Sequence, residues 1–228
     1  MVEKEKMDEQ QNKPFKIKLR INTEDLVQVA DDICKNMSPM FVTSKLNSDD
    51  IGKDIEGEGI YLGTCAPVDR DGVSLKKVFN VFAAPEDLPE TMKYVDAVKY
   101  ITLLKKWNGY DGTNYATDKE LYTALKDGTY NGGWIIPTRD ILHGKDVDGK
   151  DTTPDNILAH QDTGSFKGTF KMAASSGSDC PDWYWSSTED RDNPSGVWVV
   201  RLSDGNDFWG PKDGLRLSCR PVRLVPIK

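Results

Sequence analysis

Four cysteines carry the most reactive side chains of this chain, and their spacing limits what they can do: Cys34, Cys65, Cys180 and Cys219. A zinc ribbon or a thioredoxin-like redox site needs cysteines two residues apart, and no such pair occurs in the sequence. Cys180 and Cys219 could meet only if their strands are neighbours. Because no export signal is visible, we expect all four to be reduced thiols that pack as small apolar groups.

The two histidines, His143 and His160, limit metal and acid–base chemistry further. A three-histidine site cannot form within one chain, and a Ser-His-Asp triad would have to use one of these two rings. The sequence contains no nucleophile elbow, phosphate-binding loop or GxGxxG pattern. A glycosidase-like pair stays open as an alternative, although nothing places two carboxylates at working distance. The sequence therefore favours a non-catalytic protein without a cofactor.

The segment DVDGKD is the best candidate for a metal site, because its carboxylates alternate around a glycine as they do in calcium loops. These carboxylates belong to Asp146, Asp148 and Asp151. The segment lacks the distal bidentate glutamate of an EF-hand, and no flanking helices are predicted. A polar turn is the favoured interpretation, and weak calcium binding is the alternative.

Aromatic and polar side chains gather near the C-terminus, in a charged loop and in the turn and strand that follow it. Aromatic rings bury a large area at small entropic cost, and carboxylates, amides and arginine give directional hydrogen bonds. We therefore predict a binding surface for a protein or glycan, with Trp183 and Trp209 as its exposed rings. The alternative is that Phe208 and Trp209 fill core space. The predicted binding residues are Trp183, Glu189, Arg191, Asp192, Asn193, Asp204, Asn206, Asp207, Trp209, Lys212 and Asp213.

The composition of the 228 residues excludes some classes of partner. The net charge is -7, which argues against nucleic-acid binding because phosphate contacts need clustered Lys and Arg. No apolar run approaches the roughly 18 residues that a membrane helix needs. The first 20 residues contain no apolar signal region, so we expect cytoplasmic synthesis and no secretory signal. A surface role would then require assembly into a virion or an exported complex.

Three segments carry apolar residues at helical spacing. They predict helices over residues 21–37, 88–109 and 116–128. The last is the best marked, with a capping box formed by Thr117 and Glu120 and a terminating Gly128. Residues 1–22 mix Lys and Glu without an apolar period, and we expect them to form a mobile or partner-bound arm.

Alternating apolar residues and turn signals indicate the strands. They predict strands over 60–68 and 78–84, a short strand pair in 164–170, and an antiparallel meander from 182 to 225. The segment 134–142 predicts a short strand broken by Pro137, followed by a helical turn. Helices therefore precede most of the strands, which predicts an α+β fold rather than an alternating βαβ fold.

Three blocks of the sequence resemble a known family in their order and spacing. GGWIIPTRDIL, YWSSTE with VWVVRLSDG, and the closing RLSCRPVRLV resemble segments of formylglycine-generating enzymes and the related Lcl-type (DUF1566) domains. The resemblance covers about residues 115–225. It implies a C-type-lectin-like domain, in which two helices pack on a small twisted antiparallel sheet with long loops.

The resemblance also bears on activity. Formylglycine-generating enzymes use a close cysteine pair that binds copper, and the related sulfoxide synthases use a histidine cluster; this sequence matches neither. The calcium motifs of sugar-binding C-type lectins are matched only in part, at residues 193–195 and 205–207. The same framework carries the variable proteins of diversity-generating retroelements, found on phage tails and bacterial surfaces, in which exposed positions near the C-terminus contact the target.

These observations predict three regions: an arm over 1–22, a helix and strand region over 23–110, and a C-type-lectin-like ligand-binding domain over 111–228. We expect the middle region to anchor the protein and to be partly integrated with the last. The expected function is non-catalytic recognition of a protein or glycan receptor by a phage-tail or virion-associated oligomer. Residues 1–37 would bind an assembly partner, and no membrane insertion is expected. The alternatives are a structural virion component without a ligand and a formylglycine-generating-type oxidoreductase.

Overall fold

The computed structural model describes residues 46–69, 73–104, 115–172 and 178–227. The chain divides into two compact units, Met1–Phe41 and Val42–Lys228, and all described residues belong to the second. The arm predicted over 1–22, the helix predicted over 21–37, the proposed assembly contact of residues 1–37 and Cys34 therefore lie outside the described residues.

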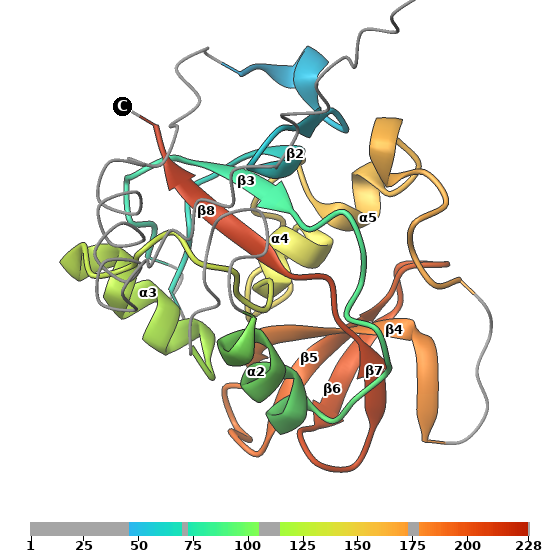
Figure 1. Cartoon of the computed structure of the whole chain (residues 1–228). Helices are drawn as coiled ribbons and strands as arrows, with labels where there is room; N and C mark the ends of the chain where they lie inside the picture. The colour runs from blue at the N-terminus through green and yellow to red at the C-terminus, as the bar shows by residue number, and fades with distance from the viewer. Residues whose placement is uncertain (1–45, 70–72, 105–114, 173–177, 228) are drawn as a thin grey trace, which may run out of the picture. The chain divides into compact units, whose positions relative to one another are not determined.

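The predicted α+β class is confirmed, because the described residues form eight strands in two mainly antiparallel sheets and four α-helices. The first sheet has the strand order β1-β2-β3-β8, and all its pairs are antiparallel (Figure 1). Its strands are β1 (Asp54–Ile55), β2 (Gly59–Cys65), β3 (Phe79–Ala83) and β8 (Val222–Pro226). Since β3 pairs with β8, segments from both of the last two predicted regions share one sheet.

The second sheet has the order β6-β5-β4-β7. Its strands are β4 (Asp179–Glu189), β5 (Gly196–Arg201), β6 (Asp207–Pro211) and β7 (Arg216–Ser218). β7 lies parallel to β4, and β8 leaves for the first sheet, so the antiparallel meander predicted through residue 225 is wrong at its end. The crossing at 219–221 is fixed by backbone bonds, because the carbonyls of Cys219 and Pro221 accept from the amides of Leu88 and Ala84.

The bounds and caps of the helices can be compared with the local sequence signals that predicted them. The helices are α2 (Tyr94–Leu103), α3 (Asp118–Asp127), α4 (Arg139–His143) and α5 (Ile157–His160). In α3 the Thr117 hydroxyl accepts from the amide of Glu120, as predicted, and Gly128 ends the helix with a φ of 72°. The carboxylate of Glu120, however, accepts from the amide of Ala116 rather than from that of Thr117.

Two other local predictions differ from the structure. The helix predicted from residue 88 begins only at Tyr94, because Leu88 and Met92 instead donate backbone hydrogen bonds to Cys219 and Leu217. The strand pair predicted in 164–170 is wrong. That segment contains the short 3-10 helix Gly164–Phe166, and its apolar side chains are used for packing, with Phe166 stacked on Phe170 at 5.9 Å between ring centroids.

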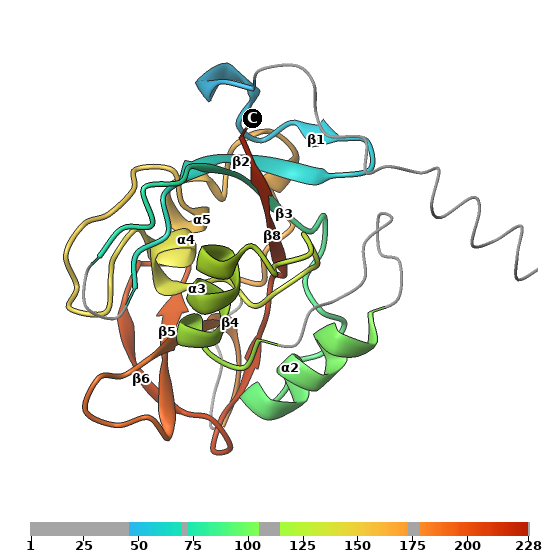
Figure 2. The same cartoon turned by 90° about the vertical axis from the view of Figure 1, so that its left-hand side faces the viewer.

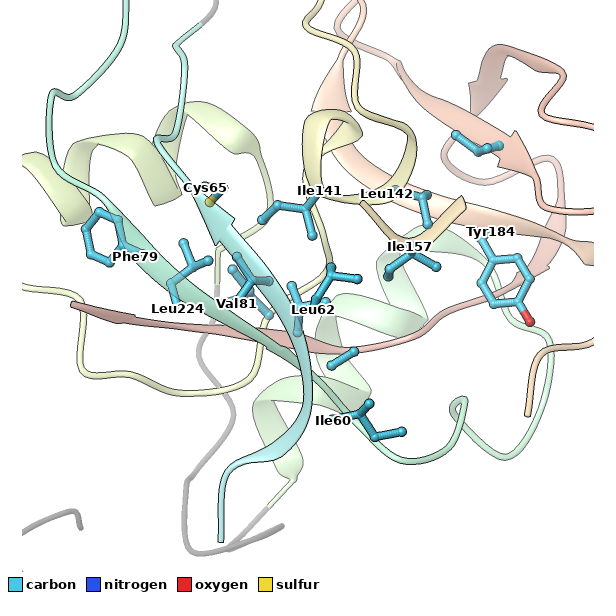
Figure 3. Packing of buried hydrophobic residues seen from close by; sticks show 14 of the residues in the cluster. Ile60, Leu62, Cys65, Phe79, Val81, Ile141, Leu142, Ile157, Tyr184 and Leu224 are labelled. Carbon is cyan, nitrogen blue, oxygen red and sulfur yellow. The ribbon is translucent and has the colours of Figure 1, made fainter. Parts of the chain in front are cut away.

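Two large hydrophobic clusters and one small one hold the described residues together. The first lies against β2, β3 and β8 and includes residues of α3, α4 and α5 as well as Tyr184 and Val200 of the second sheet (Figure 3). The second joins α2 to the opposite face of the second sheet through Tyr94, Trp185 and Val199. Both of these clusters draw on both halves of the described chain, and a smaller third cluster of Tyr61, Phe82 and Val225 lies within the first sheet. Within the described residues, no helix is long and apolar enough to cross a membrane.

Candidate functional site

The predicted binding residues lie at two ends of the β4-β5-β6 ladder. β5 pairs with β6 from Gly196 opposite Pro211 to Val200 opposite Asp207, and its six residues span about 20 Å. The loop 190–195 and the segment after β6 lie at one end, called the loop end here, and the turn 202–206 lies at the other, called the turn end. The charged loop therefore lies beside Trp209 and Lys212, whereas the turn 202–206 lies at the other end of the ladder.

The loop between β4 and β5 is held by its own side chains. One carboxylate oxygen of Asp190 accepts from the amides of Asp192 and Asn193, both at 2.9 Å. The side-chain oxygen of Asn193 accepts from the amide and the hydroxyl of Ser195, at 3.2 and 2.6 Å. These bonds fix the backbone, and Arg191, Asp192 and Asn193 are exposed, as a binding loop requires.

The calcium candidates lie beside this loop. Asp148 forms an ion pair with Arg191 at 3.2 Å, and the Asp146 carboxylate accepts from the amides of Asp148 and Lys150, both at 2.9 Å. Asp151 is exposed and takes part in a backbone bridge with Lys145. In the part of the chain that the structure describes, no group of three or more His, Cys, Asp or Glu side chains is placed to hold a metal ion.

Glu189 and Lys212 connect the loop end to the interior. Glu189 is only 8% exposed, and its carboxylate lies 2.5 Å from the Lys212 ammonium. That ammonium also lies 5.7 Å from the centroid of the Tyr94 ring. Asp213 is exposed on the turn that follows. Glu189 therefore faces inward and orients Lys212, while Asp213 faces solvent.

Trp209 packs over the start of β5. Its indole is half-buried and donates to the carbonyl of Asn193 at 3.3 Å. A Cβ atom at Gly196 would lie only 2.0 Å from the indole nitrogen, so this ring position requires a glycine beneath it. Trp209 thus supports the backbone of the loop 190–195, and only part of its ring is exposed to solvent.

Asp207 belongs to a network that ties β6 to α4. Its carboxylate accepts from Nε of Arg139 at 3.0 Å and lies 2.9 Å from Nδ1 of His143. The Arg139 guanidinium stacks 3.6 Å from the centroid of the Trp198 ring, which lies on the same face of the sheet. Asp207 was predicted as a binding residue, but in the structure its carboxylate holds β6 against α4.

The same network shifts two pKa values. Burial alone would raise the pKa of Asp207, but the hydrogen bonds and charge of Arg139 and His143 outweigh it and lower that pKa. Burial lowers the pKa of His143, and this outweighs the opposing effect of the Asp207 carboxylate. The folded protein therefore favours a charged Asp207 beside a neutral His143.

The turn end gathers aromatic rings and charges. Trp183 and Phe208 contact edge to face, with ring centroids 4.7 Å apart, and Phe208 is 41% exposed. The Arg201 guanidinium lies 5.1 Å from the centroid of the Trp183 ring and pairs with Asp204, whose Oδ1 accepts from its Nε at 2.8 Å. Asn206 donates its side-chain amide to the same Asp204 carboxylate at 2.7 Å. Two rings thus lie beside an ordered polar cluster.

Sequence reasoning named Trp183, Asp204 and Asn206 but placed neither Arg201 nor Phe208 among the binding residues. Neighbouring residues of a strand point to opposite faces, so either Phe208 or Trp209 had to face the more open side. The register decides this, because Phe208 lies opposite Val199 and Trp209 lies opposite Trp198. Register depends on distant pairing, and no local signal distinguishes the two rings.

The cysteines have separate environments. Cys65 and Cys219 are buried free thiols, and burial raises the pKa of both. Cys180 is half-buried on β4. A raised pKa disfavours the reactive thiolate at Cys65 and Cys219, as expected for thiols used in packing.

No protein-family model matches the chain, and no curated protein matches it at a significant level.

Proposed function

We propose that the protein is a non-catalytic recognition protein with a C-type-lectin-like domain, and that it binds a protein or glycan target through the turn end. The arrangement of the described elements supports this fold. Two ten-residue helices flank the sheets, the last strand returns to pair with β3, and the second sheet carries the irregular connections.

The observation that carries the proposal is the cluster of Trp183, Phe208 and Arg201 beside Asp204 and Asn206. Tryptophan and arginine are enriched among the residues that dominate binding energies, and the exposed ring of Phe208 adds apolar contact area. The contacts between these side chains fix them before a target arrives, so little ordering entropy is lost on binding. The same combination of ring faces with carboxylate and amide groups suits sugar hydroxyls and protein surfaces alike.

The assembly in which the protein works is a further part of the proposal. We propose that residues 1–37 attach the chain to a larger oligomeric assembly that displays the turn end. The family resemblance points to a phage tail or another virion component as that assembly. No metal is required, because rings and hydrogen-bonding groups alone supply the contacts at the turn end.

Screening of the purified full chain on a glycan array and by affinity capture tests this proposal. The double variant Arg201→Ala/Phe208→Ala should lose at least about tenfold in affinity for any target found, because it removes two central contacts. Lys119→Ala/Lys126→Ala is the matched control, since both lysines are exposed on α3. The control should bind like the unmodified chain, and all proteins should melt at similar temperatures. A target that the Arg201/Phe208 variant still binds with full affinity contradicts the proposal.

A further inference from the structure

A separate groove lies between the start of β3, the end of β8 and the C-terminal end of α3. Its volume is about 610 Å³, which falls within the range of small-molecule sites. Figures 1 and 2 both place the C-terminal end of β8 and the strand β6 at opposite ends of the described unit. The groove is therefore distinct from the turn end.

The walls of the groove are mainly apolar. Phe79 and Leu125 reach it from the first hydrophobic cluster, and Phe79 stands at one end of the row of core side chains in Figure 3. Val78 and Ile227 complete the wall, and each is 47% exposed. Apolar side chains that gather around an open groove suggest a ligand whose burial removes them from water.

The charged side chains among the described residues that line the groove are all basic. Lys76 and Lys77 line it and are exposed, and none of the described lining residues is acidic. Lys76 has a φ of 56°, the only positive φ of a non-glycine residue in the described part of the chain. Its amide donates to the Ser74 hydroxyl at 3.3 Å, which helps to hold this uncommon backbone conformation. The conformation fixes where two neighbouring lysines meet the apolar wall.

The backbone around the groove is poorly suited to binding another strand. Along β8 the Leu224 amide donates to the Tyr130 hydroxyl at 3.1 Å, and Pro226 has no amide hydrogen. The amide of Ile227 donates to the Val78 carbonyl at 3.3 Å. An extended peptide would find few backbone partners here, which favours a ligand held by apolar contact and charge.

We propose that this groove binds a single-chain anionic amphiphile, a fatty-acid-like molecule free in solution. Its apolar chain lies along Phe79, Leu125 and Ile227, and its carboxylate lies between Lys76 and Lys77. This site is independent of target recognition at the turn end.

Titration of the full chain with dodecanoate below its critical micelle concentration tests the proposal, followed by backbone amide NMR signals. The amides of Val78, Gly128 and Ile227 should shift. Dodecyltrimethylammonium, which has the same chain length and the opposite charge, should bind at least about tenfold more weakly. The variant Lys76→Glu/Lys77→Glu should lower dodecanoate affinity by about tenfold or more, and Lys99→Glu/Lys150→Glu should leave it within about twofold. Ile227→Asp should weaken binding without changing the melting temperature.

Three outcomes overturn the proposal. The first is the absence of dodecanoate-induced shifts at the groove, and the second is equal affinity for both amphiphiles. The third is unchanged affinity in a folded Lys76→Glu/Lys77→Glu variant. If an acidic apolar peptide shifts the groove signals while dodecanoate does not, the groove is a peptide site instead.

Discussion

Arg139 of α4 reaches Asp207 of the edge strand β6, with Nε 3.0 Å from the carboxylate and the guanidinium stacked on Trp198. The side chain of Arg139 is only 4% exposed, so removal of the Asp207 charge would leave a nearly buried guanidinium without its ion-pair partner, although its hydrogen bonds to the carbonyls of Asp146 and Val147 remain. Asp207→Asn should therefore lower the free energy of unfolding by about 2–4 kcal/mol, measured by urea denaturation. Asp213→Asn makes the same change at an exposed site and should cost less than about 0.5 kcal/mol. Equal losses of unfolding free energy in the two variants would show that the Arg139–Asp207 ion pair adds no more stability than an exposed carboxylate.

The same network predicts a pH dependence of stability. The pKa of His143 is lower in the folded protein than its ordinary value of 6.5, so the unfolded chain binds more protons below that pH. Stability should thus fall as the pH decreases from about 6.5 to the folded pKa of His143. The pKa of Asp207 is also lowered, and its contribution is lost at more acidic pH, below its ordinary value of 3.8.

The variant His143→Gln isolates the histidine contribution. It should flatten the pH dependence below about 6.5, in the range where His143 titrates, while the loss at more acidic pH remains. Urea denaturation at closely spaced pH values measures both ranges. An unchanged slope just below pH 6.5 would show that His143 titrates alike in the folded and unfolded chains.

The position of Trp209 depends on the missing side chain of Gly196. The φ of Gly196 is not in the left-handed region, so alanine fits its backbone and the effect is purely steric. Gly196→Ala should displace the indole, weaken its bond to Asn193 and shift the NMR signal of the indole N–H. Gly57 has a φ of 77° and nothing within 4 Å of an added Cβ, so Gly57→Ala strains the backbone but should leave that signal in place. If Gly196→Ala leaves the signal unmoved, the close packing is absent in solution.

Arg220 fixes the crossing between the two sheets and should be sensitive to substitution. It is fully buried, its Nε lies 2.7 Å from the Asp87 carboxylate, and its Nη2 donates to the Thr169 carbonyl at 2.7 Å. Arg220→Lys keeps the charge but loses the planar fork, and it should lower the free energy of unfolding by about 3–5 kcal/mol. Arg216→Lys changes an exposed arginine nearby and should cost under about 1 kcal/mol. Similar losses would show that the buried hydrogen bonds of Arg220 contribute little.

Local sequence signals predicted where helices and strands form better than they predicted which strands pair with one another. The caps of α3, Thr117 and Gly128, are encoded within a few residues, and the helix forms between them. The end of the meander was wrong because the partner of Val222 is Ala83, far away in sequence, and nothing local specifies it. The division of the binding residues between two ends of the ladder has the same cause. Side-chain chemistry identified Trp183 and Asp204, but register and strand direction determine what lies beside them.

The pairing of β3 with β8 has a consequence for synthesis on the ribosome. About 140 residues separate the two strands, so β3 emerges long before its partner is translated. Until then, one edge of β3 has no neighbouring strand, and the first hydrophobic cluster lacks Val222 and Leu224. Nascent chains should therefore stay sensitive to protease and to chaperones until β8 has left the exit tunnel, after which folding is completed in a late, cooperative step.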